Sequence, residues 1–280
     1  MDNSTSNPLF KHFRQPAIYF KLPSGGRYWP EGSLNLPITG EIPIFPMTAR
    51  DEITLRTPDA LLNGQGVVDV IQSCCPNIVD AWQMPSIDLD PIIIAIRIAS
   101  YGNEMDIASV CPSCEHDNEH TMNLQYMTAN MRMPDYSEFE AGGLKFKLKP
   151  QPYLQANKQN MMQFEEDKLL KVINNQDLDD DAKLAQFNMH LARMVEISLI
   201  TLANSTDYIK SDDQVITNTG YITEYYQNCD AATVKVVREH IDKVSEQANY
   251  TRVDVKCESC DHSYKVNMTF DYASFFAQSS

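Results

Sequence analysis

Two Cys-x-x-Cys units constrain this chain more than any other feature of its sequence. The first is Cys111-Pro112-Ser113-Cys114 and the second is Cys257-Glu258-Ser259-Cys260. Thiolates at this spacing reach one ion from a single tight turn, and structural zinc takes four ligands in a tetrahedron. We therefore predict that Cys111, Cys114, Cys257 and Cys260 together hold one structural Zn²⁺ and leave no position for water.

Each cysteine unit lies between two segments with strand character. Asp106–Val110 and Thr121–Leu124 flank the first unit, and Thr251–Lys256 and Tyr264–Phe270 flank the second. We expect two β-hairpins that form a zinc-ribbon-like pair. Binding of a structural zinc contributes ~10–16 kcal/mol in zinc-finger peptides. Such a site would tie two distant turns together, so the residues between them would be an insertion.

Other uses of these cysteines are open at this point. His116 and His120 follow the first unit and His262 follows the second, so a histidine could replace a cysteine; solvent-facing hairpin residues are the simpler interpretation. A redox dithiol favours a helix N-terminus for its first cysteine, whereas these pairs lie between strands. The seven cysteines are an odd number, and the N-terminus lacks the layout of a signal peptide, which disfavours a disulfide framework.

The pattern of polar and apolar residues divides the 280-residue chain into four parts. Residues 1–16 are polar and unpatterned, which predicts a flexible N-terminal tail. Residues 17–130 are predicted to form a domain that is rich in β-structure and helices and includes the first cysteine unit. Residues 131–249 predict a mainly helical insertion, and residues 250–280 the second cysteine hairpin with a C-terminal tail. The expected fold class is α+β: small antiparallel β elements with helices, the paired hairpins and the helical insertion.

Helix signals are clear at several places. Thr48 offers a hydroxyl N-cap followed by acidic residues. In the segment from Asp88 to Tyr101, Asp90 can cap and Pro91 fits the first helical position. In the insertion, Leu144, Phe146 and Leu148 alternate as in a strand. Apolar residues at helical spacing predict two amphipathic helices: Phe187, Leu191, Met194, Val195, Leu199 and Leu202 in one, and Val234, Val237, Ile241 and Val244, capped by Asp230, in the other.

Composition excludes several functional classes. The net charge is −15, and such a chain is repelled by phosphate polymers unless its cations cluster. Only Lys145, Lys147 and Lys149 alternate, so nucleic-acid binding is disfavoured and a protein partner with a basic or mixed surface is expected. The longest apolar stretch, residues 92–98, is far short of the ~20 residues that span a bilayer, so we expect no membrane association. No phosphate loop, dinucleotide fingerprint or nucleophile elbow occurs, so we predict no enzyme.

Four sequence blocks carry a family resemblance. They occur in a fixed order before and up to the first cysteine unit: LPSGGRYWP at 22–30, PMTARDE at 46–52, TPDALLNG at 57–64 and RIASYG at 97–102. In this order the chain resembles the T4-type bacteriophage baseplate hub proteins. The resemblance covers roughly residues 17–150 and the second cysteine unit, and it leaves out the helical residues 155–250.

The resemblance implies a non-enzymatic role in building a contractile tail. The chain would be a subunit or an assembly chaperone of the central baseplate hub, with other hub and tail proteins as partners. It would act in the host cytoplasm during assembly, with the virion as the alternative location. Two other hypotheses stay open: a zinc-ribbon adaptor that binds nucleic acid or transcription machinery, and a zinc hydrolase in which water replaces one cysteine.

Overall fold

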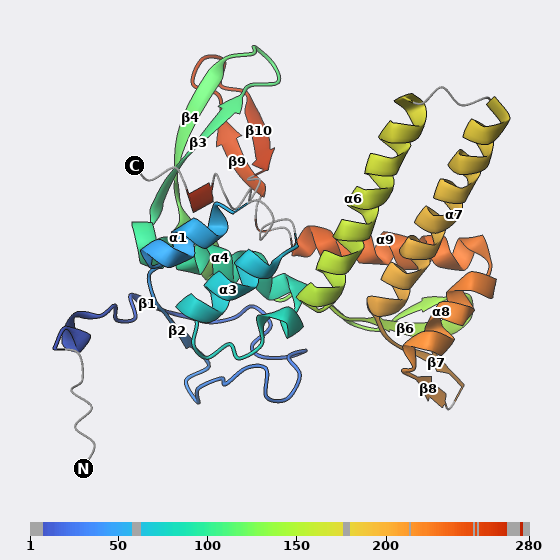
Figure 1. Cartoon of the computed structure of the whole chain (residues 1–280), viewed down its shortest axis with the longest axis horizontal. Helices are drawn as coiled ribbons and strands as arrows, with labels where there is room; N and C mark the ends of the chain where they lie inside the picture. Colours follow the sequence, from blue (N-terminus) through green and yellow to red (C-terminus); the bar gives the residue numbers. More distant parts are fainter. Residues whose placement is uncertain are drawn as a thin grey trace.

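Two hydrophobic cores organise the chain, and a helical hairpin and a pair of β-hairpins project from them (Figure 1). The computed structural model describes residues 8–57, 63–175, 180–212, 214–248, 250, 252–267 and 275–276. Within these residues the chain combines helices with small antiparallel sheets, which confirms the predicted α+β class. None of the helices in the described part of the chain is long and apolar enough to cross a membrane.

The first core surrounds a helix whose consecutive isoleucines, from Ile92 to Ile94, are fully buried. A short antiparallel strand pair and further helices pack around it. The elements of this part are β1 (Ile18–Phe20), β2 (Ile42–Ile44), α1 (Ala49–Leu55), α3 (Gln65–Cys74), α4 (Ser86–Tyr101), α5 (Leu124–Asn130) and the 3-10 turns Phe10–His12 and Ala81–Gln83. Because α4 is apolar nearly all round, it can be covered on several sides at once.

A capping box starts α1, as the sequence predicts. The Thr48 hydroxyl accepts a hydrogen bond from the Asp51 N–H at 3.3 Å, and Asp51 Oδ2 accepts one from the Thr48 N–H at 2.7 Å. Arg14 reaches the same carboxylate at 3.3 Å and also donates to the Pro46 carbonyl at 2.6 Å and the Ser73 carbonyl at 2.8 Å. The predicted flexible tail is therefore attached to the first core at Arg14. Residues 1–7 of that tail lie outside the described residues.

Helix α4 begins earlier than the sequence indicates. Asp90 was the predicted cap and Pro91 the predicted first helical residue, but α4 starts at Ser86, whose N–H donates to the Gln151 carbonyl at 2.8 Å. Pro91 therefore lies inside the helix, where the missing N–H leaves the Ile87 carbonyl without its intrahelical partner. Tertiary packing around Gln151 outweighs the local preference of Pro91. The earlier start places Asp88 in the first turn, where it organises the neighbouring loop.

The second core lies within residues 131–249. Its four-stranded antiparallel sheet has the order β5-β6-β7-β8, and α8 and α9 pack against it with the end of α7. The elements are β5 (Phe139–Ala141), β6 (Leu144–Leu148), β7 (Thr206–Ser211), β8 (Gln214–Ile216), α8 (Thr219–Asn228) and α9 (Ala231–Gln247). The predicted strand is β6, and Asp230 caps α9 as predicted by accepting from the Thr233 N–H at 2.9 Å.

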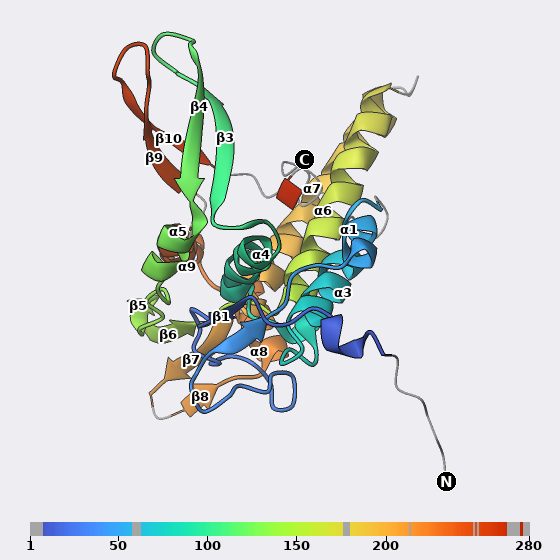
Figure 2. The same cartoon turned by 90° about the vertical axis from the view of Figure 1, so that its left-hand side faces the viewer.

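Two long helices, α6 (Tyr153–Asn175) and α7 (Asp180–Asn204), stand side by side and extend beyond both cores (Figures 1 and 2). Glu166 joins them by hydrogen bonds to Arg193 at 2.9 Å and His190 at 3.0 Å. The apolar stripe predicted in this segment divides along α7. Leu202 is buried in the second core, whereas Phe187 and Leu191 are 45% and 46% exposed.

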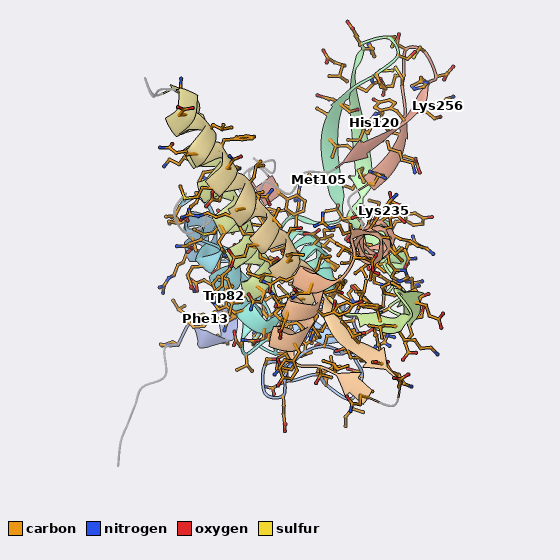
Figure 3. The ribbon with its side chains drawn as sticks, turned by 90° about the vertical axis from the view of Figure 1, so that its right-hand side faces the viewer. Phe13, Trp82, Met105, His120, Lys235 and Lys256 are labelled. Carbon is orange, nitrogen blue, oxygen red and sulfur yellow. The ribbon has the colours of Figure 1, made fainter. Side chains whose placement is uncertain are left out.

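The two predicted β-hairpins are present. Strands β3 (Glu104–Val110) and β4 (Asp117–Asn123) form one, and β9 (Arg252–Lys256) and β10 (Ser263–Asn267) form the other. They rise next to each other above α4 and α5 (Figure 2). His120 on β4 and Lys256 on β9 lie at similar heights in this projection (Figure 3). The hairpin tips meet, because the Cys111 and Cys260 sulfurs lie 3.7 Å apart although these residues are far apart in sequence.

Candidate metal centre

The four predicted cysteines meet in one cluster at the tips of the two hairpins. Their sulfur atoms all lie within 4.8 Å of one another. Cys111 and Cys257, the first cysteine of each pair, are buried, whereas Cys114 and Cys260 are exposed. The sequence therefore identified every member of the cluster, and the fold brings together both halves.

The two turns have the same backbone structure. In each, the N–H of the first cysteine donates to the carbonyl five residues later, His116 or His262, at 2.9 Å. In each, the residue after the second cysteine, Glu115 or Asp261, adopts a left-handed conformation with φ of 58°. This repeated turn aims both sulfurs of a pair at the same point. The two Cys-x-x-Cys turns therefore present their sulfurs with nearly the same backbone geometry.

The sulfur separations fit a tetrahedral ion. The distance is 3.7 Å from Cys111 Sγ to Cys260 Sγ and 3.6 Å from Cys114 Sγ to Cys257 Sγ. A zinc–sulfur bond of about 2.3 Å in tetrahedral geometry requires sulfurs about 3.8 Å apart. A disulfide would require about 2.05 Å. These two separations, with all four sulfurs within 4.8 Å of one another, are therefore compatible with a four-thiolate metal site.

The electrostatics of the cluster also suit a cation. Burial raises the pKa of the Cys257 thiol, but hydrogen bonds from the backbone N–H groups of Cys260 and Ser259 and from the thiols of Cys114 and Cys111 together lower this pKa to about 6. A backbone hydrogen bond at His116 lowers the pKa of Cys114, but the neighbouring thiols outweigh it and raise this pKa to about 12. One thiolate forms readily and then opposes the next. A divalent cation at the centre would remove that opposition.

Asn118 connects the two hairpins beside the cluster, and it belongs to no sequence motif. This buried side chain donates to the His116 carbonyl at 2.9 Å and to the Tyr264 hydroxyl at 3.2 Å, and it accepts from the Glu258 N–H at 2.9 Å. The Tyr264 hydroxyl also pairs with Ser109 Oγ at 2.7 Å. These bonds cross from one hairpin to the other. A lone asparagine in a strand carries no sequence signal for such a role.

The histidines near the cysteine units lie outside the cluster. Among the described residues, the group of potential metal ligands consists of the four cysteines without His116, His120 or His262. The His262 ring instead lies parallel to the Tyr264 ring, with 6.3 Å between centroids. The remaining cysteines are apart from the cluster: Cys74 and Cys75 are buried in the first core and Cys229 is half-buried in the second.

Comparisons with known proteins give one match. A family described as "T4 bacteriophage base plate protein" matches residues 18–277. The match runs through both cores and both cysteine units, and it includes the helical residues 155–250 that the four sequence blocks leave out. Comparison with curated proteins and with solved structures gives no match.

Proposed function

The chain belongs to the T4 bacteriophage base plate protein family, and from this we propose that it is a non-enzymatic subunit or assembly chaperone of the central baseplate hub. The observation that carries the proposal is the extent of the family match, residues 18–277, which includes every α-helix and strand of the two cores. Its partners are other hub and tail proteins. It acts in the host cytoplasm during assembly, and the tail baseplate is where a stable subunit would remain.

The four-cysteine cluster serves this role as a structural zinc site. Zinc bound by Cys111, Cys114, Cys257 and Cys260 has four protein ligands and no open position, so it supplies stability rather than catalysis. It fastens the two hairpins to each other and so closes residues 115–256 into one loop. Four thiolates also argue against the zinc hydrolase, which needs a coordinated water.

Zinc ligation is tested by metal content and by cobalt spectroscopy. Purified protein is expected to contain one zinc per chain, and the cobalt form to show the charge-transfer bands of four thiolates. Cys257→Ser is expected to lose zinc, whereas Cys229→Ser, on a half-buried cysteine outside the cluster, keeps it. Zinc content that is equal in the two variants would contradict the assignment.

The α6–α7 hairpin supports action through protein–protein contacts. Exposed apolar residues recur on α7 at spacings of three and four, which places them on one helix face. They are Leu184, Phe187, Leu191 and Val195, with exposures of 58%, 45%, 46% and 58%. Contiguous exposed apolar surface of this kind marks interaction sites in soluble proteins. Figure 1 shows that the hairpin projects from the body, where a partner can reach it.

Co-purification from infected cells tests the hub role. The tagged full-length chain is expected to retain hub proteins, and deletion of its gene is expected to leave tails without a complete hub. Phe187→Glu with Leu191→Glu should abolish the co-purification, while Val215→Glu, at a 55% exposed residue on β8, should preserve it. Retention of no tail protein by the wild-type chain, together with normal tails after gene deletion, would overturn the proposal.

A second assay addresses the alternative adaptor role. A nucleic-acid-binding zinc ribbon would bind oligonucleotides more tightly as salt is lowered. The net charge of −15 opposes such binding. Salt-dependent binding of the full-length chain at micromolar concentration would favour the adaptor over the hub protein.

A further inference from the structure

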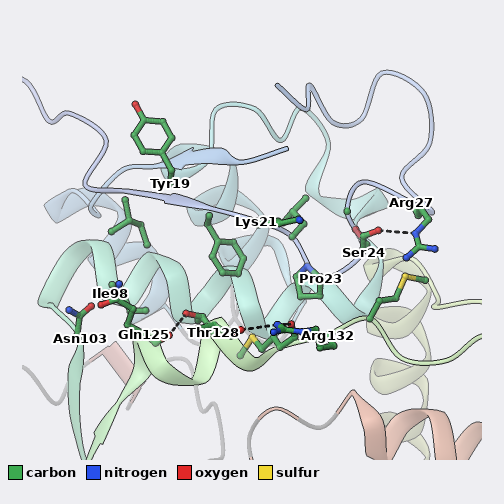
Figure 4. A pocket seen from close by; sticks show the side chains of 17 residues that line it. Tyr19, Lys21, Pro23, Ser24, Arg27, Ile98, Asn103, Gln125, Thr128 and Arg132 are labelled. Carbon is green, nitrogen blue, oxygen red and sulfur yellow. Dashed lines mark hydrogen bonds between the residues drawn. The ribbon is translucent and has the colours of Figure 1, made fainter. Parts of the chain in front are cut away.

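A pocket lies between β1 with its following turn and α5. Its volume is about 790 Å³, and Figure 4 shows the β1 segment along one side and the residues of α5 along the other. Phe20, Leu22, Ile98 and Met131 supply buried apolar surface to it. The pocket is thus an elongated groove beside a strand, which we call the β1 groove.

The strand that borders the β1 groove has an open edge. Among the described strands, β1 pairs with β2 alone. Tyr19 lies opposite Pro43 in this pair, and proline has no N–H to donate. The ladder bonds therefore come from Ile18 and Phe20, while the N–H and C=O of Tyr19 point away from β2. An open edge of this kind can accept an added strand.

The charge of the β1 groove is opposite to that of the chain as a whole. Three cationic side chains line it, Lys21, Arg27 and Arg132, and none of its lining residues is Asp or Glu. The whole chain has 38 acidic and 23 basic residues, so a cationic surface without carboxylates is a local departure from its composition. Charge complementarity therefore favours an acidic occupant.

Hydrogen bonds hold two of these cations in place. Arg132 Nη1 donates to the carbonyls of Ala129 and Met131 at 2.8 and 2.7 Å, and Arg27 Nε donates to the Ser24 carbonyl at 3.3 Å. A guanidinium has five N–H donors, so each retains donors for a carboxylate. Because these two side chains are already held in place, they lose less conformational entropy when a ligand binds.

Buried Asp88 fixes the turn that carries Arg27. Its carboxylate accepts from the Ser24 N–H at 2.9 Å, from the Ser24 hydroxyl at 2.5 Å and from Trp29 Nε1 at 2.8 Å. The wall of the β1 groove is therefore set by the first core and does not depend on a ligand.

We propose that the β1 groove binds an extended acidic peptide segment of another protein, which adds a strand to β1. The peptide backbone pairs with the Tyr19 N–H and C=O, alternate side chains pack on the apolar floor, and the intervening carboxylates contact Lys21, Arg27 and Arg132. A folded helix would leave the edge of β1 unpaired, and a small anion would leave the apolar floor uncovered. The β1 groove is separate from the four-cysteine cluster and from the α6–α7 hairpin. A test of peptide binding in the groove is therefore independent of any test of the hub role.

A labelled peptide of seven residues that alternates valine and glutamate tests the proposal on the full chain by fluorescence anisotropy. We expect saturable binding that protects the Tyr19 amide from hydrogen exchange. Lys21→Glu and Arg132→Glu should each weaken binding at least about tenfold, while Lys235→Glu, a 76% exposed lysine on α9, should leave it unchanged. Thermal unfolding of each variant verifies that it folds.

Several outcomes would overturn this site. One is a failure of the acidic peptide to bind the wild-type chain; another is equal binding by the Arg132→Glu and Lys235→Glu variants. Methylation of alternate backbone nitrogens of the peptide should abolish binding, so unchanged affinity would refute strand addition. Preference for a single-stranded oligonucleotide over the peptide would assign the groove to nucleic acid instead.

Discussion

Replacement of Asn118 by alanine provides a sharp test of how the two hairpins are held together. The wild-type side chain makes three hydrogen bonds, two of which join the first hairpin to Tyr264 and Glu258 of the second. A hydrogen bond contributes about 0.5–1.5 kcal/mol net, and an orphaned buried donor or acceptor costs about 1–3 kcal/mol. Three bonds are lost while the His116 carbonyl keeps the bond from the Cys111 N–H, so we expect a total loss of about 2–4 kcal/mol.

In the proposed zinc site this loss should appear in metal affinity, because the four cysteines surround one ion only when the hairpins are in register. At about 1.4 kcal/mol for each factor of ten, zinc affinity should fall by about 30- to 1,000-fold. The assay is competition for zinc between the full-length chain and a chromogenic chelator at fixed pH. Glu119→Ala, on an exposed neighbour in β4, is the matched control and should bind zinc as the wild type does.

A smaller perturbation probes the same network. Tyr264→Phe removes the hydroxyl that pairs with Ser109 and Asn118, and should cost about 1 kcal/mol. In a double-mutant cycle with Asn118→Ala the two effects should be less than additive, because they share one bond. Zinc affinity of Asn118→Ala within about threefold of the wild type would refute the view that these bonds set the register.

Three further predictions concern the two cores and the α6–α7 hairpin. Gly142→Ala should destabilise the chain by about 2 kcal/mol more than Gly143→Ala in urea unfolding. Both glycines have positive φ, but only at Gly142 would the added methyl group lie 2.4 Å from Thr233 Oγ1. Equal losses of stability in the two variants would contradict this prediction. Burial raises the pKa of Asp88 above its ordinary 3.8, so the folded chain holds a proton on this carboxyl that the unfolded chain has already lost. The stability advantage of the wild type over Asp88→Asn should therefore shrink as pH rises from 3.8 through the raised pKa. A growing advantage would refute the raised pKa of Asp88. A hydrogen bond from Arg193 lowers the pKa of Glu166, so the ionised carboxylate stabilises the pairing of α6 with α7. Glu166→Gln should therefore speed hydrogen exchange in α6 at pH 7, and the difference in exchange rate from the wild type should shrink as pH falls through the lowered pKa. Equal exchange rates at pH 7 would show that these interhelix bonds contribute nothing to stability.

Local chemistry made the cysteine turns and several helix ends predictable. The Cys-x-x-Cys spacing, the alternating flanks and the Thr48–Asp51 capping box all act over a few residues, so the sequence displays them directly. The same holds for the strand Leu144–Leu148 and for the Asp230 cap. These features need no knowledge of what lies across from them.

Features that depend on distant segments were not predictable. Strand β7 reads Thr-Asp-Tyr-Ile-Lys-Ser, which has little strand pattern of its own, and it forms because β6 lies beside it. The start of α4 moved to Ser86 because Gln151, from a segment far along the chain, binds its N–H. Pairing energy from a remote partner outweighs a local propensity of a few tenths of a kcal/mol.

By itself, then, the sequence determined which residues would form the four-cysteine cluster, which helix faces are apolar and that the chain resembles baseplate proteins. Only the tertiary structure decided that Phe187 and Leu191 stay exposed, that Asn118 joins the hairpins and that three cations line one groove. Periodicity specifies which residues share a face, because it follows from backbone geometry. What covers that face depends on the arrangement of segments distant in sequence, which no local pattern encodes.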